Sequence, residues 1–324
     1  MTLHCAFIGF GKSTTRYHLP YVLHRKDRWQ VAHIYRRRAK PEEQAPQYSH
    51  IHFTSDLDEV LNDPLVKLVV VCTHADSHFE YAKKALEAGK NVLVEKPFTP
   101  TLEEAKTLFA LANSKGLTVT PYQNRRFDSC FLTTKKVIES GKLGELVEIE
   151  SHFDNYRPLA ETNPGGPQNG EFYGLGVHTL DQIISLFGRP DHVSYDLRSL
   201  RNKANPDDTF EAQLFYGDMK AIVKTSHLVQ IDYPKFIVHG HKGSFVKYGI
   251  DQQETSLKAN IMPGEPGFGA DDSVGELVYV NEAGEMVREA VPLESGDYGR
   301  VYDALYDTLV NGQPNYVKET DVLT

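Results

Sequence analysis

The sequence has few cysteines, no long apolar run and no excess of positive charge, and each absence excludes a class of protein. Its three cysteines, Cys5, Cys72 and Cys130, do not amount to a disulfide framework. No apolar run is long enough to span a bilayer, and the first residues lack the layout of a signal peptide. We therefore expect a cytoplasmic protein that does not cross a membrane.

The charge balance argues against partners that carry many negative charges. The 324 residues include 35 basic and 44 acidic side chains, which gives a net charge of -9. Nucleic acids and anionic membranes are bound through basic patches, and the one local basic cluster is Arg36-Arg37-Arg38. The aromatic residues do not alternate with basic ones, as they would on a nucleic-acid platform. We therefore expect a small-molecule substrate, with no nucleic acid and no membrane as partner.

The hydrophobic pattern of residues 1–122 predicts strands that alternate with helices. Leu68–Cys72 is a continuous apolar run, which suits a strand that is buried on both faces. Thr101 and Glu104 have the spacing of a capping box at the start of a helix. This alternation predicts an α/β domain with a doubly wound parallel sheet. The expected strands cover residues 3–8, 30–35, 68–72, 91–94 and 117–121.

Residues 123–324 predict a second domain of a different kind, with the boundary near Tyr122. Apolar residues recur at every second position in several segments, which is typical of strands with one covered face. Short turns at 216–218 and 240–243 predict hairpins, and residues 179–187 predict a helix. We expect an α+β domain with a mostly antiparallel open sheet, whose exposed face forms a homodimer or larger oligomer. Residues 318–324 resemble the first turn of a helix, and we expect the natural chain to continue beyond them.

A turn that contains two glycines indicates dinucleotide binding. Gly9-Phe10-Gly11-Lys12-Ser13-Thr14 follows a strand and precedes a helix, which is the context of the Rossmann fingerprint. In that fingerprint the first glycine forms the turn, the second admits the pyrophosphate, and the helix N-terminus faces its charge. Thr14 replaces the third glycine. A Walker A motif is excluded, because Ala6 stands where its first glycine would be. The alternative is a strand–turn–helix without a ligand.

The end of the second expected strand bears on the choice between NAD and NADP. An acidic residue about 20 positions after the glycines would bind the adenosine ribose of NAD. The sequence instead has Tyr35-Arg36-Arg37-Arg38. A guanidinium matches a 2′-phosphate, so Arg36 and Arg37 favour NADP, with NAD still possible. The alternative is a solvated basic loop.

Motifs along essentially the whole chain resemble those of the Gfo/Idh/MocA (glucose–fructose oxidoreductase / inositol dehydrogenase) oxidoreductase family. No single motif is sufficient, but Glu95-Lys96-Pro97 and Gly176–Asp181 are specific in this order and separation. The motifs that carry the resemblance are Gly9-Phe10-Gly11, Cys72-Thr73-His74 with His78, Ala88-Gly89-Lys90 before Glu95-Lys96-Pro97, Asn124-Arg125-Arg126-Phe127, Gly141-Lys142-Leu143-Gly144 and Gly176-Val177-His178-Thr179-Leu180-Asp181.

The resemblance implies two catalytic residues. Lys96 would lie beside the nicotinamide and the substrate hydroxyl, where an ammonium can polarise the oxygen or relay its proton. The imidazole of His178 would accept the hydroxyl proton. Asp181, one helical turn further on the same face, would bind a substrate hydroxyl or orient that imidazole. The family's motif usually has aspartate four residues before the histidine, where this chain has Gly174. The alternatives are a surface salt bridge between Lys96 and Glu95 and a structural role for His178.

The remaining site residues rest on the same resemblance. His74 and His78 have the spacing of a metal pair, but no third ligand is apparent, and the resemblance places them at the edge of the cofactor without a metal. Asn155 and Arg157 are expected to bind substrate, with an ordinary strand-to-loop exit as an equal alternative. The resemblance also implies a cis bond before Pro97. The residues expected at the cofactor are Gly9, Phe10, Gly11, Lys12, Ser13, Thr14, Arg36, Arg37, Cys72, Thr73, His74, His78, Glu95, Lys96 and Asn124.

These observations predict an NAD(P)-dependent oxidoreductase that acts on CH–OH groups, with a sugar, polyol or related small molecule as substrate. Two alternatives remain open. An NAD-dependent glycosidase would oxidise a ring carbon transiently to expel its leaving group. A non-catalytic dinucleotide-binding sensor would account for Gly174 at a position where the family usually has aspartate.

Overall fold

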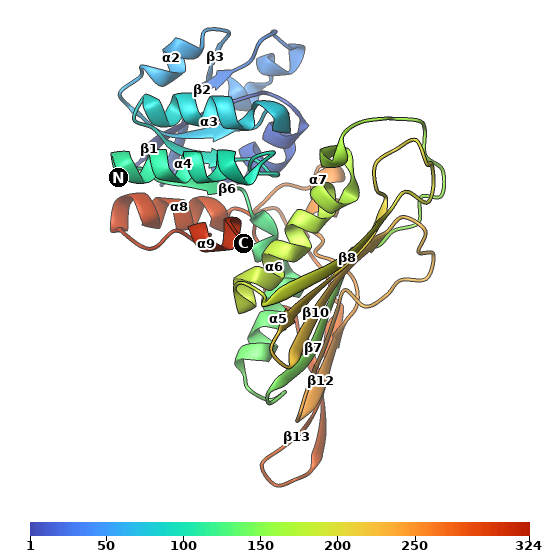
Figure 1. Ribbon diagram of the computed structural model, residues 1–324. Coiled ribbons are helices and arrows are strands. Elements are labelled where there is room, and N and C mark those ends of the chain that lie inside the picture. The colour runs from blue at the N-terminus through green and yellow to red at the C-terminus, as the bar shows by residue number, and fades with distance from the viewer. The chain divides into compact units, whose positions relative to one another are not determined.

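The computed structural model describes residues 1–324 and divides into two compact units, each described here by itself (Figure 1). None of its helices has the length and hydropathy that crossing a membrane requires. The first unit comprises Met1–Asn124, Asn260–Pro266 and Tyr298–Leu323. The second comprises Arg125–Ala259, Gly267–Asp297 and Thr324.

The first unit contains a six-stranded parallel sheet with the order β3-β2-β1-β4-β5-β6. This is the strand order of a dinucleotide-binding Rossmann fold, and it confirms the doubly wound parallel sheet that the alternating pattern predicts. Sequence periodicity does not reveal the short β3, which lies at the sheet edge. The strands are β1 (Leu3–Ile8), β2 (Trp29–Tyr35), β3 (His52–Thr54), β4 (Val66–Val71), β5 (Asn91–Val94) and β6 (Val119–Pro121).

Helices cover both faces of this sheet because successive residues of a strand point to opposite sides. Ala6 and Ile8 of β1 pack in one core with α2, α3 and α4. Phe7 points to the other face, where its ring contacts His18 and where His18 contacts Tyr302 of α8. The helices of the first unit are α1 (Leu19–Leu23), α2 (Leu57–Leu61), α3 (His78–Glu87), α4 (Leu102–Lys115), α8 (Arg300–Asn311) and α9 (Glu319–Val322).

Local sequence signals place several helix starts correctly. The Thr101 side chain accepts a hydrogen bond from the Glu104 backbone, and the Glu104 carboxylate accepts one from the Thr101 backbone, which completes the expected capping box. Pro20 lies in the first turn of α1, where its missing N–H costs little. The segment before α1 is a short π-helix, η1 (Thr14–His18).

The C-terminal part of the chain returns to the first unit. Tyr298, Val301, Tyr302 and Leu305 are buried in or next to α8, and the Trp29 indole donates a hydrogen bond to the carbonyl of Tyr302 at 3.0 Å. The compact units are therefore not the two consecutive segments 1–122 and 123–324. A boundary near Tyr122 between independently folding domains stays a prediction.

The second unit contains an eight-stranded sheet with the order β14-β13-β12-β11-β7-β10-β9-β8. All neighbouring strands are antiparallel except β10 and β7, so the expected mostly antiparallel open sheet is confirmed. The strands are β7 (Leu146–His152), β8 (His192–Arg198), β9 (Thr209–Tyr216), β10 (Met219–Ser226), β11 (Phe236–Gly240), β12 (Gly243–Lys247), β13 (Val274–Val280) and β14 (Met286–Pro292).

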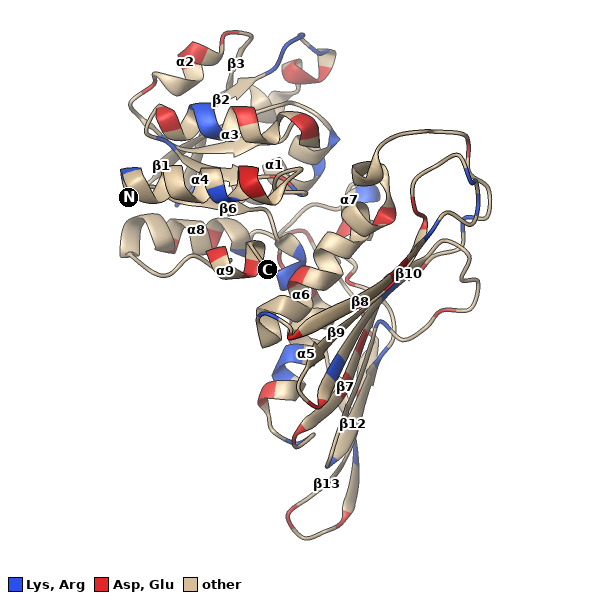
Figure 2. Cartoon of the chain, in the orientation of Figure 1, with Lys and Arg blue, Asp and Glu red and all other residues tan.

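Helices α5 (Ser129–Glu139) and α6 (Val177–Phe187) pack on one face of this sheet through Val137 and Ile183, and α7 (Gln253–Lys258) is a short additional helix. The opposite face carries charged pairs such as Lys220–Glu148 and Lys224–Glu211. Acidic and basic residues are interspersed over both units (Figure 2). The open face is thus polar as well as apolar, because inward residues alternate with charged outward ones.

Candidate active site

The turn after β1 requires glycine at its first position and leaves open space at its second. Gly9 has a φ of +114°, and a Cβ there would lie 2.6 Å from the carbonyl oxygen of Cys72. Any other residue would be strained and would collide with the backbone after β4. No atom lies within 4 Å of an ideal Cβ on Gly11. A side chain is thus excluded at Gly9 by the protein itself, whereas the space beside Gly11 can admit a pyrophosphate.

Thr14 replaces the third glycine of the fingerprint without disturbing the turn. It is fully buried, and its hydroxyl donates a hydrogen bond to the carbonyl of Gly9 at 2.9 Å. The backbone N–H of Thr15 also donates to the carbonyl of Gly11 at 3.1 Å. The threonine therefore closes the turn from inside, so the missing glycine does not argue against the fingerprint.

The carboxylate of Glu95 connects this turn to the segment that carries Lys96. The Ser13 hydroxyl donates to Glu95, the backbone N–H of Lys96 donates to its Oε2 at 3.0 Å, and His18 Nε2 lies 3.0 Å from its Oε1. Burial acts to raise the pKa of Glu95, but the His18 hydrogen bond and charge outweigh it and lower the pKa to about 2. Glu95 is thus a buried anion, which excludes a surface salt bridge as its role. The peptide bond between Lys96 and Pro97 is cis, as the resemblance implies.

His18 is a residue that the sequence analysis does not identify. Its ring is fully buried, its Nδ1 lies 2.7 Å from the Tyr302 hydroxyl, and it stacks at 4.0 Å on the ring of Tyr122. His18 and Tyr302 are separated by 284 residues, so no local spacing could have revealed the pair. The histidine joins the glycine turn, the Glu95 carboxylate and α8.

The end of β4 contributes side chains that differ in role. His78 is buried, with Nδ1 at 2.8 Å from the carbonyl of Pro97 and Nε2 at 3.1 Å from that of Thr73. Because both ring nitrogens face backbone carbonyls, His78 ties two segments of the site together. His74 is exposed, and burial raises the pKa of the Cys72 thiol, which keeps it protonated. Asn124 is buried at the end of the first unit.

The basic cluster after β2 is only partly open to a ligand. The Arg36 guanidinium binds the Glu43 carboxylate through two hydrogen bonds, at 2.6 and 2.9 Å, and this pair lowers the pKa of Glu43. Arg37 is exposed. Lys12 is exposed as well, whereas the Phe10 ring is buried against Tyr48 and Phe53. Only the backbone of Phe10 therefore borders the turn.

In the second unit, Asp181 is engaged by arginine. Its two oxygens each accept a hydrogen bond from Arg126 at 2.7 Å, and both side chains are about nine-tenths buried. His178 lies one turn earlier on α6 and is also buried. The Asp181 charge is therefore compensated by a guanidinium, a partner that the helical spacing of the motif does not reveal.

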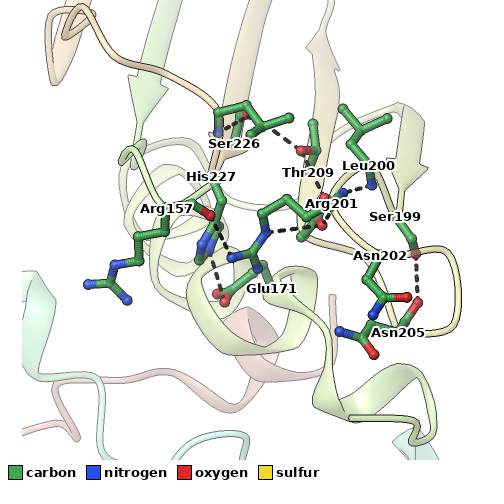
Figure 3. Close-up of polar contacts among 12 residues, drawn as sticks. Arg157, Glu171, Ser199, Leu200, Arg201, Asn202, Asn205, Thr209, Ser226 and His227 are labelled. Carbon is green, nitrogen blue, oxygen red and sulfur yellow. Dashed lines mark hydrogen bonds and ion pairs between the residues drawn. The ribbon is translucent and has the colours of Figure 1, made fainter. Parts of the chain in front are cut away.

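Asn155 and Arg157 lie beside a carboxylate–histidine pair. Their backbone N–H groups donate to Ser226 at 3.0 Å and to His227 at 2.8 Å. His227 Nε2 lies 3.0 Å from Oε1 of Glu171, a close ionic contact whose angles are not those of a hydrogen bond. Figure 3 shows the His227 ring directed at Glu171 and the Arg157 guanidinium pointing away from them. The structure thus adds Glu171 and His227 to the candidate site.

Two family models match consecutive parts of the chain. Residues 3–123 match the NAD-binding Rossmann fold of an oxidoreductase family, and residues 135–324 match the C-terminal alpha/beta domain of the same family. The chain belongs to the Gfo/Idh/MocA family. It is therefore an oxidoreductase with a nucleotide-binding Rossmann domain, and the resemblance of its motifs is confirmed.

Relatives within the Gfo/Idh/MocA family cover nearly the whole chain. The uncharacterized oxidoreductase YhhX of Escherichia coli (strain K12) is 84% identical over 324 residues, which is 100% of this chain and 94% of that protein. A crystal structure of the probable oxidoreductase yhhX has a TM-score of 0.99 at 84% identity and covers 99% of this chain and 94% of that chain. The scyllo-inositol 2-dehydrogenase (NADP(+)) IolW of Bacillus subtilis (strain 168) is 33% identical over 316 residues, 96% of this chain and 87% of that protein.

Proposed function

We propose that this protein transfers a hydride between a nicotinamide cofactor and a secondary alcohol of a sugar, polyol or related small molecule. The observation that carries the proposal is the contrast between Gly9, where the protein leaves no room for a Cβ, and Gly11, where open space begins. A glycine turn of this geometry at the carboxyl ends of parallel strands suits a dinucleotide. IolW, a relative over nearly the full chain, is named as a dehydrogenase of scyllo-inositol.

The chain's own residues supply proton handling and orientation. His178 accepts the proton of the reacting hydroxyl during oxidation and returns it during reduction. Lys96 follows a buried anion, and its ammonium polarises the same oxygen. Glu95 and the ring of His78 hold the backbone around Lys96 in place. The nicotinamide, when bound, accepts or gives the hydride.

We propose NADP as the preferred cofactor, with NAD as a weaker substitute. The support is the absence of an acidic residue at the end of β2 together with the exposed Arg37. Arg36 contributes less directly, because Glu43 engages its guanidinium. IolW is named as NADP-linked. The remaining cofactor contacts proposed from the motif are the backbone of residues 9–14, residues 72–74, and Asn124.

For the substrate, Asn155 and Arg157 are proposed contacts, and Asp181 acts together with Arg126. The Oδ1 atom of Asn155 is buried without a hydrogen-bond partner in the protein, and a substrate hydroxyl could satisfy it. The Asp181–Arg126 pair can present a guanidinium edge to a polar ligand.

The proposal is tested with a panel of polyols, aldoses and sugar phosphates, each with NAD and NADP in both directions, read by the absorbance of the reduced nicotinamide. We expect turnover on at least one polyol or sugar. Release of an aglycone without net change of the cofactor would instead identify a glycosidase. Tight cofactor binding with no turnover on any compound would identify a sensor.

We also propose a cytoplasmic location and a homo-oligomer formed through the open face of the second sheet. Exposed apolar side chains such as Val193, Tyr195 and Leu197 of the edge strand β8 support a contact with a second copy. Light scattering over a range of protein concentrations measures the mass. A monomer mass at every concentration would contradict the oligomer.

A further inference from the structure

We propose that Glu171 supplies the carboxylate that the family's motif usually has at position 174, and that it thereby acts as a positioning residue for His178. The inference rests on the proposed function, because it assigns a partner to the proposed base. Gly174 by itself suggests that the base lacks such a neighbour. The structure shows instead that the volume beside Gly174 holds a carboxylate from an earlier position in the chain.

The first step is the position of the Glu171 carboxylate. An ideal Cβ on Gly174 would lie 3.1 Å from Oε2 of Glu171 and 3.9 Å from its Cδ, and no other atom would be within 4 Å. The φ of Gly174 is outside the left-handed region, so the backbone itself does not require glycine there. A side chain at position 174 is thus restricted by the Glu171 carboxylate, and the absence of one makes room for it.

The second step is the spacing along the chain. Residues 171, 174 and 178 follow each other at intervals of three and four, which places them along one side of consecutive helical turns. Glu171 precedes the π-helix η7 (Phe172–Gly176), and His178 is the second residue of α6, which continues it. Short π-helical segments inside helices occur frequently at functional sites. A carboxylate beside Gly174 therefore lies on the side of the helix that carries His178.

The third step is what holds the carboxylate there. The buried His227 lies 3.0 Å from Oε1 of Glu171, which leaves Oε2 as the oxygen nearest to Gly174 (Figure 3). Asp207 anchors the backbone at this point, because its carbonyl accepts from the N–H of Glu171 at 3.0 Å and its carboxylate accepts from the N–H of Phe172 at 2.7 Å. Glu171 itself makes no side-chain capping bond to η7. Its carboxylate is thus not used to cap the helix.

The fourth step concerns the charges around the pair. Burial raises the pKa of Asp207, and the negative charge of Glu171 adds to this rise. The charged groups next to Glu171 are therefore His227 and Asp207, and those one turn beyond His178 are Asp181 and Arg126. Both oxygens of Asp181 are bound by Arg126. Glu171, whose side chain is 28% exposed, remains the acidic group that can face His178 and still be reached by a polar substrate.

The test compares Glu171→Gln with the wild type and with Glu282→Gln, which removes an exposed carboxylate in the turn between β13 and β14. The first readout needs no substrate: the pH titration of histidine ring signals by NMR, with His178 assigned by its loss in His178→Gln. Removal of a nearby negative charge should lower the midpoint of His178 by about half a unit or more. Glu282→Gln should leave this midpoint unchanged.

A second variant pair tests whether the position of the carboxylate is what matters. Glu171→Leu combined with Gly174→Asp returns a carboxylate to position 174, and it should restore the midpoint that Glu171→Leu alone lowers. With a substrate from the panel, Glu171→Gln should reduce kcat by about tenfold or more with a smaller change in KM, and the combined variant should recover most of it.

The outcomes separate this inference from the proposed function. A lowered His178 midpoint in Glu171→Gln supports the inference even if the wild type turns over no compound on the panel, a result that would instead count against the proposed function. An unchanged midpoint in Glu171→Gln overturns the inference, whatever happens to thermal stability. A combined variant that folds but does not restore the midpoint overturns it as well.

Discussion

The Oε1 atom of Glu95 lies 3.0 Å from Nε2 of His18, in the interior of the first unit. This contact joins the glycine turn to the residue before Lys96, and Tyr302 of α8 extends it from the other ring nitrogen. One buried anion therefore holds the backbone of two motifs that are more than eighty residues apart in sequence.

The first prediction concerns the effect of pH on stability through Glu95. Its pKa lies at about 2 in the folded protein against an ordinary 4.5, so its stabilising contribution is present above about pH 4.5 and is lost as the pH falls toward 2. At pH 7 we expect Glu95→Gln to lower the free energy of unfolding by about 3 kcal/mol. Urea unfolding at pH 7 and pH 3 should show a smaller difference from wild type at pH 3. An equal difference at both values would contradict the assigned cause.

The second prediction contrasts the two glycines of the turn. Gly9→Ala places a Cβ 2.6 Å from the Cys72 carbonyl at a φ of +114°, so it should destabilise the protein by about 2 kcal/mol or more. Gly11→Ala meets no protein atom and should unfold within about 0.5 kcal/mol of wild type, yet bind the cofactor at least about tenfold more weakly. Thermal unfolding and calorimetric titration with NADPH measure the two effects. Unimpaired binding by Gly11→Ala would argue against a pyrophosphate at this turn.

The third prediction separates the two arginines after β2. Arg37→Ala should weaken NADPH binding about tenfold or more and leave NADH unchanged, because an exposed guanidinium–phosphate pair is lost. Arg36→Ala also leaves the buried Glu43 carboxylate without its partner, and it should therefore lower stability as well as affinity. Calorimetric titration with both cofactors and thermal unfolding provide the readouts. Equal affinity of the wild type for NADPH and NADH would contradict the NADP preference.

The fourth prediction addresses the proposed catalytic residues. His178→Ala should reduce turnover by about 10²- to 10⁴-fold while cofactor affinity is unchanged, because the histidine handles only the substrate proton. Lys96→Met should reduce turnover and also weaken cofactor binding, because Lys96 is proposed to contact both. Steady-state kinetics and NADPH titration distinguish the two patterns. Full turnover by His178→Ala would show that the histidine is structural.

Several parts of the fold are readable from local sequence. The continuous apolar run of residues 68–72 indicates a strand buried on both faces, and the capping box at Thr101 marks the start of α4, because both signals depend on near neighbours in the chain. The alternation of residues in β9 and β10 likewise predicts a sheet with one covered face. The strand orders of the two sheets are not visible in these patterns, since they depend on pairings between distant segments.

The candidate site divides in the same way. The sequence by itself determined the glycine turn, the Glu-Lys-Pro segment and the histidine of the second unit, because their chemistry lies in short, ordered motifs. Only the tertiary structure decided that Glu43 engages Arg36, that Arg126 binds Asp181, that His18 holds Glu95, and that Glu171 fills the space beside Gly174. The physical reason is that the environment of a charged side chain depends on buried partners, most of which folding brings from distant parts of the chain.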